Sequence, residues 1–115
     1  MSPRAVARKA ELEQALRQIV VNLVERYRPQ CIILYGLLAR GECGEWSDID
    51  LCVIKETDEP FVKRAVEADL ATERTVAMDF VVYTPAEWRQ MLANGNYFVR
   101  DEILAKGKVL YGRPE

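Results

Sequence analysis

The chain has 115 residues, half of them hydrophobic and 30% charged, which is typical of one globular domain. Its formal net charge of −2 gives no indication of a nucleic-acid or membrane partner, and no apolar run approaches the roughly 20 residues that span a bilayer, so we expect a cytoplasmic protein with no direct nucleic-acid binding. The absence of histidine excludes Ser-His-Asp triads, Cys-His dyads and histidine-ligated zinc, which leaves carboxylates, lysine, arginine, hydroxyl groups and thiols for any chemistry.

The first half of the chain predicts one long helix and two strands. Apolar residues recur at three- and four-residue steps up to Tyr27, which indicates an amphipathic helix, and Pro29 ends it. The next five residues are a continuous apolar run, typical of a strand that is buried on both faces. The predicted elements are a helix over residues 6–27, a strand over residues 31–35, one helical turn over residues 37–40, a polar loop over residues 41–47 and a strand over residues 49–55.

The second half alternates helices with strands. Thr84, Pro85 and Glu87 have the order of an N-cap, a first-turn proline and the third residue of a capping box. The predicted elements are a helix over residues 61–74, with Val62, Ala65, Val66 and Leu70 on one side, a strand over residues 78–83, a helix from residue 84 to about 93, a helix over residues 97–105 and a short strand over residues 108–111. This alternation predicts an α/β (α+β) fold with a small mixed sheet of three to four strands flanked by helices.

Three cysteines are spaced without a metal-binding pair, and their odd number argues against a disulfide framework. Cys31 and Cys52 lie in apolar runs, so we expect buried core thiols. Cys43 lies in a polar loop and is the candidate for an exposed thiol.

Three aspartates are the candidate functional residues. Side chains alternate along a strand, so Asp48 and Asp50 point the same way while the apolar residues beside them point into the core. Asp79 opens the third predicted strand, where a charge is otherwise out of place, and it completes a three-carboxylate cluster if that strand lies beside the second. An Asp-x-Asp pair is also common at a strand start, where it is solvated or caps a turn.

Clustered carboxylates favour a hard divalent cation. Two anions about 4 Å apart repel by roughly 4 kcal/mol at an effective dielectric near 20, so the cluster either holds a cation or remains in water. Oxygen ligands of this kind suit Mg²⁺ or Mn²⁺, and three carboxylates can hold two ions at the spacing that phosphoryl and nucleotidyl transfer use. Because Mg²⁺ seldom binds protein carboxylates alone, we expect the phosphates of ATP or another NTP as further ligands.

Three segments follow one another in a fixed order: Gly36-Leu37-x-Ala39-Arg40-Gly41, then Ser47-Asp48-Ile49-Asp50-Leu51, and then Asp79 on a later strand. This order resembles the minimal nucleotidyltransferases (MNT) of the DNA polymerase β superfamily. The resemblance covers most of the chain, including the Thr84-Pro85 helix start. It implies the polymerase β-like fold and a single nucleotidyltransferase domain over residues 1–115.

The resemblance also implies roles for single residues. Asp48, Asp50 and Asp79 are the metal ligands and the catalytic residues, and the nucleotide-binding candidates are Gly36, Leu37, Arg40 and Ser47. Gly36 lets the backbone approach the triphosphate. Arg40 contacts phosphate or instead forms an ion pair that holds the loop, and Ser47 contacts the nucleotide or instead orients the start of the strand.

Leu37 departs from the family pattern, which has serine after the first glycine. Leucine cannot form the hydrogen bond that the serine hydroxyl makes to the triphosphate. Losing one hydrogen bond to a charged phosphate costs on the order of 1.5–3 kcal/mol.

The activity implied by the resemblance is in-line attack of an acceptor hydroxyl on the α-phosphorus of Mg²⁺–NTP, with release of pyrophosphate. Stand-alone members resemble the antitoxin halves of toxin–antitoxin systems, which transfer AMP to a tyrosine of an all-helical HEPN ribonuclease. Two alternatives stay open, a non-catalytic module that neutralises a partner by contact and an enzyme that modifies a small molecule such as an aminoglycoside.

The acceptor site must come from another protein or from an oligomer partner, because the chain has no room for a second domain. The candidates for a partner surface are Trp46, Trp88, Tyr97 and Phe98. The alternative for each of these side chains is packing on its own helix.

Overall fold

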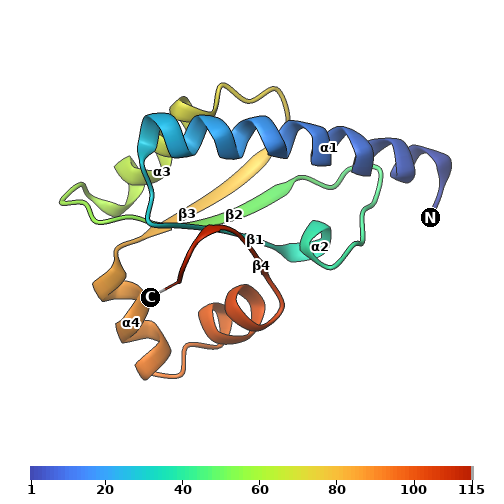
Figure 1. Cartoon of the computed structure of the whole chain (residues 1–115). Coiled ribbons are helices and arrows are strands. Elements are labelled where there is room, and N and C mark those ends of the chain that lie inside the picture. Colours follow the sequence, from blue (N-terminus) through green and yellow to red (C-terminus); the bar gives the residue numbers. More distant parts are fainter. Residues whose placement is uncertain (115) are drawn as a thin grey trace.

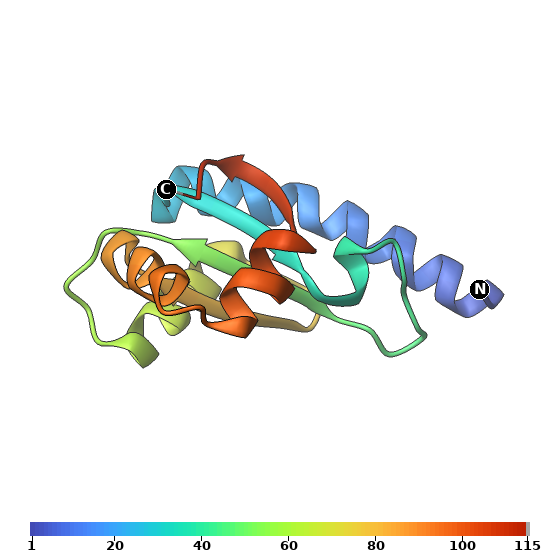
Figure 2. The same cartoon turned by 90° about the horizontal axis from the view of Figure 1, so that it is seen from below.

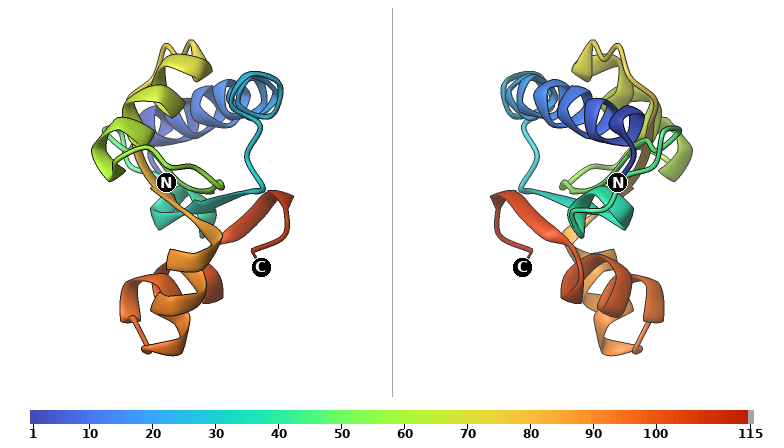
Figure 3. Two further views of the ribbon diagram at one scale, coloured as in Figure 1. Left: turned by 90° about the vertical axis from the view of Figure 1, so that its left-hand side faces the viewer. Right: turned by 90° about the vertical axis from the view of Figure 1, so that its right-hand side faces the viewer.

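The computed structural model describes residues 1–114 as a mixed four-stranded sheet between two helical layers (Figures 1 and 3). Within these residues, no helix combines the length and the apolarity that crossing a membrane requires. The elements are, in chain order, α1 Pro3–Asn22, the π-helix η1 Leu23–Tyr27, β1 Cys31–Tyr35, α2 Gly36–Ala39, β2 Ile49–Ile54, α3 Phe61–Thr72, β3 Met78–Tyr83, α4 Pro85–Ala93, the π-helix η2 Phe98–Ala105 and β4 Lys108–Gly112.

The strand order is β3-β2-β1-β4, which confirms the predicted mixed sheet. Strand β1 pairs antiparallel with both β2 and β4, whereas β2 pairs in parallel with β3. The sheet therefore places β2 between β1 and β3, so residues along β2 have neighbours from two different strands. Among them, Asp50 pairs with Tyr35 on one side and with Asp79 on the other.

Each face of the sheet carries its own core. Helices α1 and α3 cover one face, where Leu12, Ile19 and Leu23 pack on alternate residues of β1 and β2. Helix α4 and η2 cover the opposite face, as the end-on views of Figure 3 show, and Trp88 is the largest fully buried side chain there. Both central strands are consequently buried on both faces, as the apolar run of residues 31–35 predicted.

Two helical segments are wound more widely than the sequence predicted. The first helix begins at Pro3, capped by the Ser2 hydroxyl, and its last turn is the π-helix η1. The predicted helix over residues 97–105 is the π-helix η2, whose end is closed by a hydrogen bond from the Lys106 amide to the Asp101 carbonyl. Apolar spacing of three and four residues fits either winding, so the pattern could not distinguish them.

The apolar side of α3 does not face the core. Val62 and Leu70 are each 74% exposed. The buried side of α3 instead carries Arg64, Ala68 and Thr72. Arg64 satisfies its guanidinium there by donating to the Glu59 carbonyl at 2.7 Å and the Glu87 carboxylate at 2.7 Å, so hydrogen bonding and not apolarity fixes the rotation of this helix.

One expectation about burial was wrong, and for Trp88 the structure shows packing in place of a partner surface. Cys43 is buried, because the loop folds back onto the core and the Sγ atom lies 3.3 Å from the Gly44 carbonyl oxygen. Trp88 is fully buried as well, and its indole N–H donates to the Pro114 carbonyl oxygen at 2.9 Å. Cys31 and Cys52 are buried as expected, and the predicted capping box at Thr84 is present.

Candidate active site

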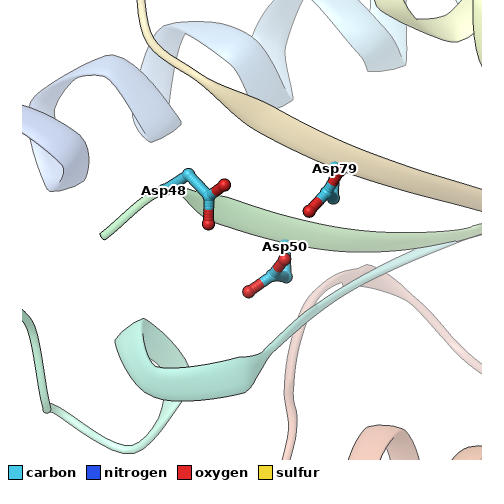
Figure 4. A group of neighbouring side chains, drawn as sticks. All are labelled: Asp48, Asp50 and Asp79. Atoms are coloured by element: carbon cyan, nitrogen blue, oxygen red, sulfur yellow. The ribbon is translucent and has the colours of Figure 1, made fainter. Parts of the chain in front are cut away.

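The three predicted aspartates lie together at one end of the sheet. Asp48, Asp50 and Asp79 each offer a carboxylate oxygen, and these oxygens all lie within 4.8 Å of one another. Figure 4 shows the three side chains facing a common space beside the short helix α2. The structure therefore brings together residues that are up to 31 positions apart in the sequence (79 − 48 = 31).

Strand register is what assembles this cluster. Asp50 stands opposite Asp79 in the parallel pair of β2 and β3, so both side chains project from the same face of the sheet. Asp48 immediately precedes β2, two residues before Asp50, and reaches the same face. Ile49 and Leu51 are fully buried on the opposite face, which fixes the register because a shift of one residue would exchange the two sets.

Without a bound cation, the three carboxylates repel one another. Burial, together with the neighbouring carboxylates of Asp48 and Asp79, raises the pKa of Asp50 from 3.8 to about 6. Asp48 and Asp50 are half-buried whereas Asp79 is exposed, so the cluster opens to solvent on the Asp79 side. A ligand of opposite charge would relieve this repulsion.

A divalent metal ion fits this donor set. Carboxylate oxygens are the ligands that Mg²⁺ and Mn²⁺ prefer. No lysine or arginine side chain among residues 1–114 forms an ion pair with one of the three carboxylates. The open side leaves room for substrate oxygens to complete the coordination. The residues that could hold a metal are thus Asp48, Asp50 and Asp79.

Gly36 forms the wall of the site next to Asp50. Its φ angle is +76°, a left-handed conformation that residues with a side chain rarely adopt. A Cβ atom at this position would lie 2.4 Å from Oδ2 of Asp50. Glycine is therefore needed twice here, for the backbone turn and for the close approach to the carboxylate.

The other nucleotide-binding candidates surround α2 and the loop that follows it. Leu37 follows Gly36 and is 44% exposed. Arg40 is exposed, and within the described part of the chain its guanidinium forms no ion pair, so the alternative of a loop-holding pair is not realised. Ser47 accepts a hydrogen bond from the Gly44 amide at 2.8 Å through its hydroxyl group, which orders the loop ahead of β2.

Sequence reasoning missed Tyr35 beside the carboxylates, and it named Phe98 only as a candidate for a partner surface. Tyr35 pairs with Asp50 across β1 and β2, and burial, with contributions from Asp50 and Asp79, raises the pKa of its phenol. Phe98 packs edge-on against the Tyr35 ring with 5.5 Å between ring centroids. Only the position of Tyr35 directly before the glycine turn could have indicated its place at the site.

Arg8 is a further residue near the site that the sequence did not single out. Its Nε atom donates to the Ser47 carbonyl oxygen at 2.9 Å, which ties α1 to the residue directly before Asp48. Its guanidinium also pairs with Glu11 in the next turn of the helix. No pattern in the sequence links residue 8 to residue 47, because the contact depends on how α1 crosses the sheet (Figure 2).

Comparisons with known proteins give a consistent result. Residues 17–115 match the family described as "Polymerase beta, Nucleotidyltransferase". The chain is 30% identical over 102 residues to a protein of Methanocaldococcus jannaschii named "Putative protein adenylyltransferase", covering 86% of this chain and 97% of that protein. The crystal structure of "a putative nucleotidyltransferase" from Sulfolobus solfataricus superposes with a TM-score of 0.68 over 100% of this chain and 93% of the other, and its 14% identity makes this a likeness of fold.

Proposed function

The chain belongs to the polymerase β nucleotidyltransferase family, and on that premise we propose that it is a Mg²⁺-dependent enzyme that transfers AMP, or another nucleoside monophosphate, from a nucleoside triphosphate to a hydroxyl group of a protein. The observation that carries this proposal is the convergence of three carboxylates within 4.8 Å of one another. We propose residues 1–115 as a single nucleotidyltransferase domain that works in the cytoplasm.

The position of each site residue indicates its role in the proposed reaction. Asp48 and Asp50, at the inner end of the cluster, would hold both metal ions, and Asp79 would hold the ion nearest the acceptor because it lies on the exposed side. Bound Mg²⁺ supplies activation of the acceptor hydroxyl and neutralises charge on the leaving pyrophosphate. Gly36 lets the α2 backbone approach the phosphates. The guanidinium of Arg40, which forms no ion pair with any residue from 1 to 114, offers a charged donor to them.

The reaction needs no nucleophile from the chain. The acceptor oxygen forms a bond to the α-phosphorus while the bond from this phosphorus to the bridging oxygen breaks, pyrophosphate leaves and the hydroxyl proton is released. The lack of histidine is compatible with this scheme, because oxygen ligands alone hold the metal.

A protein acceptor is supported by the relative from M. jannaschii and by the surface around the site. Trp46, in the loop directly before Asp48, is 90% exposed, and Tyr97 is 62% exposed beside Phe98. Exposed aromatic side chains suit the docking of another protein. We propose a HEPN-type partner protein as the acceptor, with this chain as the antitoxin of the pair.

A second candidate function rests on Leu37. Without the family hydroxyl the chain would hold the triphosphate less tightly, and it would then neutralise its partner by contact alone. The two candidates differ in one observable, which is covalent label on the partner.

The test follows ATP binding and label transfer separately. The native chain should unfold at a higher temperature in Mg²⁺ and ATP, by roughly 10 °C at about 100 times the dissociation constant, and should transfer α-phosphate label from ATP to a purified HEPN-type protein. In Asp79→Asn, transfer should fall by at least about a hundredfold. Asp58→Asn, which removes an exposed aspartate outside the cluster, is the matched control.

The outcomes separate the candidates. Binding together with label transfer supports the enzyme. A stable complex with the partner but no label in the presence of Mg²⁺ and ATP would favour the contact-only module. Absence of any nucleotide-dependent shift at millimolar ATP would contradict the proposed nucleotide site.

A further inference from the structure

A second pocket lies on the other side of α2 from the carboxylates. It has a volume of about 290 Å³ and is bounded by α1, the end of β1, α2 and β4. Its floor is apolar and includes Leu34 and Leu38, whereas its rim carries the charged side chains of Lys9, Arg17 and Lys108. Nothing in the proposed transfer reaction uses these residues.

The pocket and the carboxylate cluster belong to opposite faces of the sheet. Lys108 pairs with Leu34 across β1 and β4, so both side chains project from the same face, and Leu34 packs in the core beneath α1. Tyr35, the residue that pairs with Asp50, belongs to the core on the face covered by α4 and η2. A ligand in this pocket is therefore separated from the metal site by the sheet and by α2.

The rim of the pocket has an excess of positive charge in a chain whose net charge is −2. Three cations and one acid, Glu13, line it, and Glu13 lies 3.4 Å from Lys9. Within residues 1–114, the side chains of Arg17 and Lys108 form no hydrogen bond or ion pair. Lys9, Glu13 and Arg17 follow one another at four-residue steps, which places them in a row along one side of α1.

These features suit a small organic phosphate. Arginine and lysine together are the side chains that recognise phosphate oxygens, and an unpaired arginine offers two parallel donors. The apolar floor suits a flat or aliphatic part of the same molecule, and the volume, at the lower end of the range for small-molecule sites, excludes a large ligand.

We propose that the pocket between α1, α2 and β4 is a second binding site, which takes a small organic phosphate without a metal ion. The phosphate group lies between Arg17 and Lys108, and the apolar part of the ligand lies on Leu34 and Leu38. This inference does not depend on the proposed transfer reaction, because the site uses none of its residues.

The test is titration of the whole chain with AMP in EDTA, followed by calorimetry and by amide chemical shifts in NMR spectra. EDTA removes any metal-dependent binding at the carboxylates. We expect saturable binding with a dissociation constant of about 1 mM or tighter. We also expect the largest amide shifts at Arg17, Leu38, Gly41 and Lys108.

Matched variants remove equal charge at two places. Arg17→Gln with Lys108→Gln should weaken AMP binding by about tenfold or more, because both charge-assisted donors are lost. Arg28→Gln with Arg89→Gln removes two exposed arginines outside the pocket and should change binding by less than about twofold.

Three results would overturn the proposal. The first is a failure of AMP to saturate the protein at 10 mM, because a dissociation constant of about 10 mM is the weakest that such a site should have. The second is equal weakening in both double variants, which would indicate nonspecific charge attraction. The third is a set of amide shifts centred on Gly36 and Asp50, which would place AMP at the carboxylate site.

Discussion

Replacing Asp50 by asparagine should stabilise the metal-free protein at pH 7.5 and abolish its stabilisation by Mg²⁺. Burial and the neighbouring carboxylates raise the pKa of Asp50 from 3.8 to about 6, so the folded state binds the proton more tightly than the unfolded state. For such a carboxyl the free energy of unfolding falls as the pH rises from about 4 to 6, and the loss is complete at pH 7.5. Asparagine carries no charge and avoids this loss.

The expected gain in the free energy of unfolding follows from the rise in the pKa of Asp50. A rise of about 2 pKa units corresponds to roughly 3 kcal/mol at 1.36 kcal/mol per unit. Because Asp50 is only half-buried, solvent screening reduces this value, and we expect Asp50→Asn to gain about 1–2 kcal/mol at pH 7.5. That gain corresponds to an increase in Tm of about 4–8 °C for a domain of this size.

Thermal and urea denaturation in EDTA at pH 4 and pH 7.5 measure the gain directly. It should be present at pH 7.5 and nearly absent at pH 4, where the native carboxyl is mostly protonated. Adding Mg²⁺ at pH 7.5 should stabilise the native chain and leave Asp50→Asn unchanged. Asp58→Asn should show neither effect, because Asp58 is exposed and lies outside the cluster. A gain of equal size at both pH values would refute the electrostatic account of the cluster.

Four further predictions concern Gly36, Leu37, Arg64 and Glu87. Gly36→Ala should lower the free energy of unfolding by about 2–3 kcal/mol in urea denaturation. Gly41→Ala should lower it by only about 1 kcal/mol, because Gly41 has a similar positive φ but open space around its Cβ position. Equal losses would contradict the steric account. Leu37→Ser should increase ATP affinity or label transfer by about tenfold, and an unchanged rate would show that the missing hydroxyl is not needed. Arg64→Met should cost about 2–3 kcal/mol in thermal denaturation, since it leaves Glu87 and a buried carbonyl without their donor. Glu87→Gln should cost less, and its difference from the native chain should shrink as the pH falls from 4.5, because Arg64 lowers the pKa of Glu87 in the folded state; a difference that does not change with pH in acid would contradict this account.

The local elements of this protein could be predicted from short stretches of sequence. The strands β1 and β3 begin and end at the residues that the sequence predicted, and the capping box of α4 is formed by the three residues whose order predicted it. Such features depend on contacts within a few residues, so the sequence contains their whole cause. The direction of Asp48 and Asp50 followed in the same way from strand alternation.

Burial of single side chains was harder to predict, because it depends on what covers them. Cys43 lies in a polar loop, yet this loop folds onto the core. Trp88 was a candidate for a partner surface or for packing, and its hydrogen bond to the Pro114 carbonyl oxygen accompanies complete burial. The apolar side of α3 is exposed because contacts on the other side of the helix decide its rotation. Arg64 has three acceptors on the core side, which stabilise the rotation that leaves Val62 in solvent.

The sequence by itself indicated which chemistry to expect, since the absence of histidine and the presence of three aspartates favoured a metal ion bound by oxygen ligands. Only the tertiary structure decided that the three carboxylates meet. Asp79 could have joined any strand of the sheet, and the parallel pairing of β3 with β2 is what sets it opposite Asp50. Pairing between strands depends on contacts among residues that are distant in the chain. A local sequence pattern contains neither the entropy of closing the connecting loops nor the packing of side chains between strands.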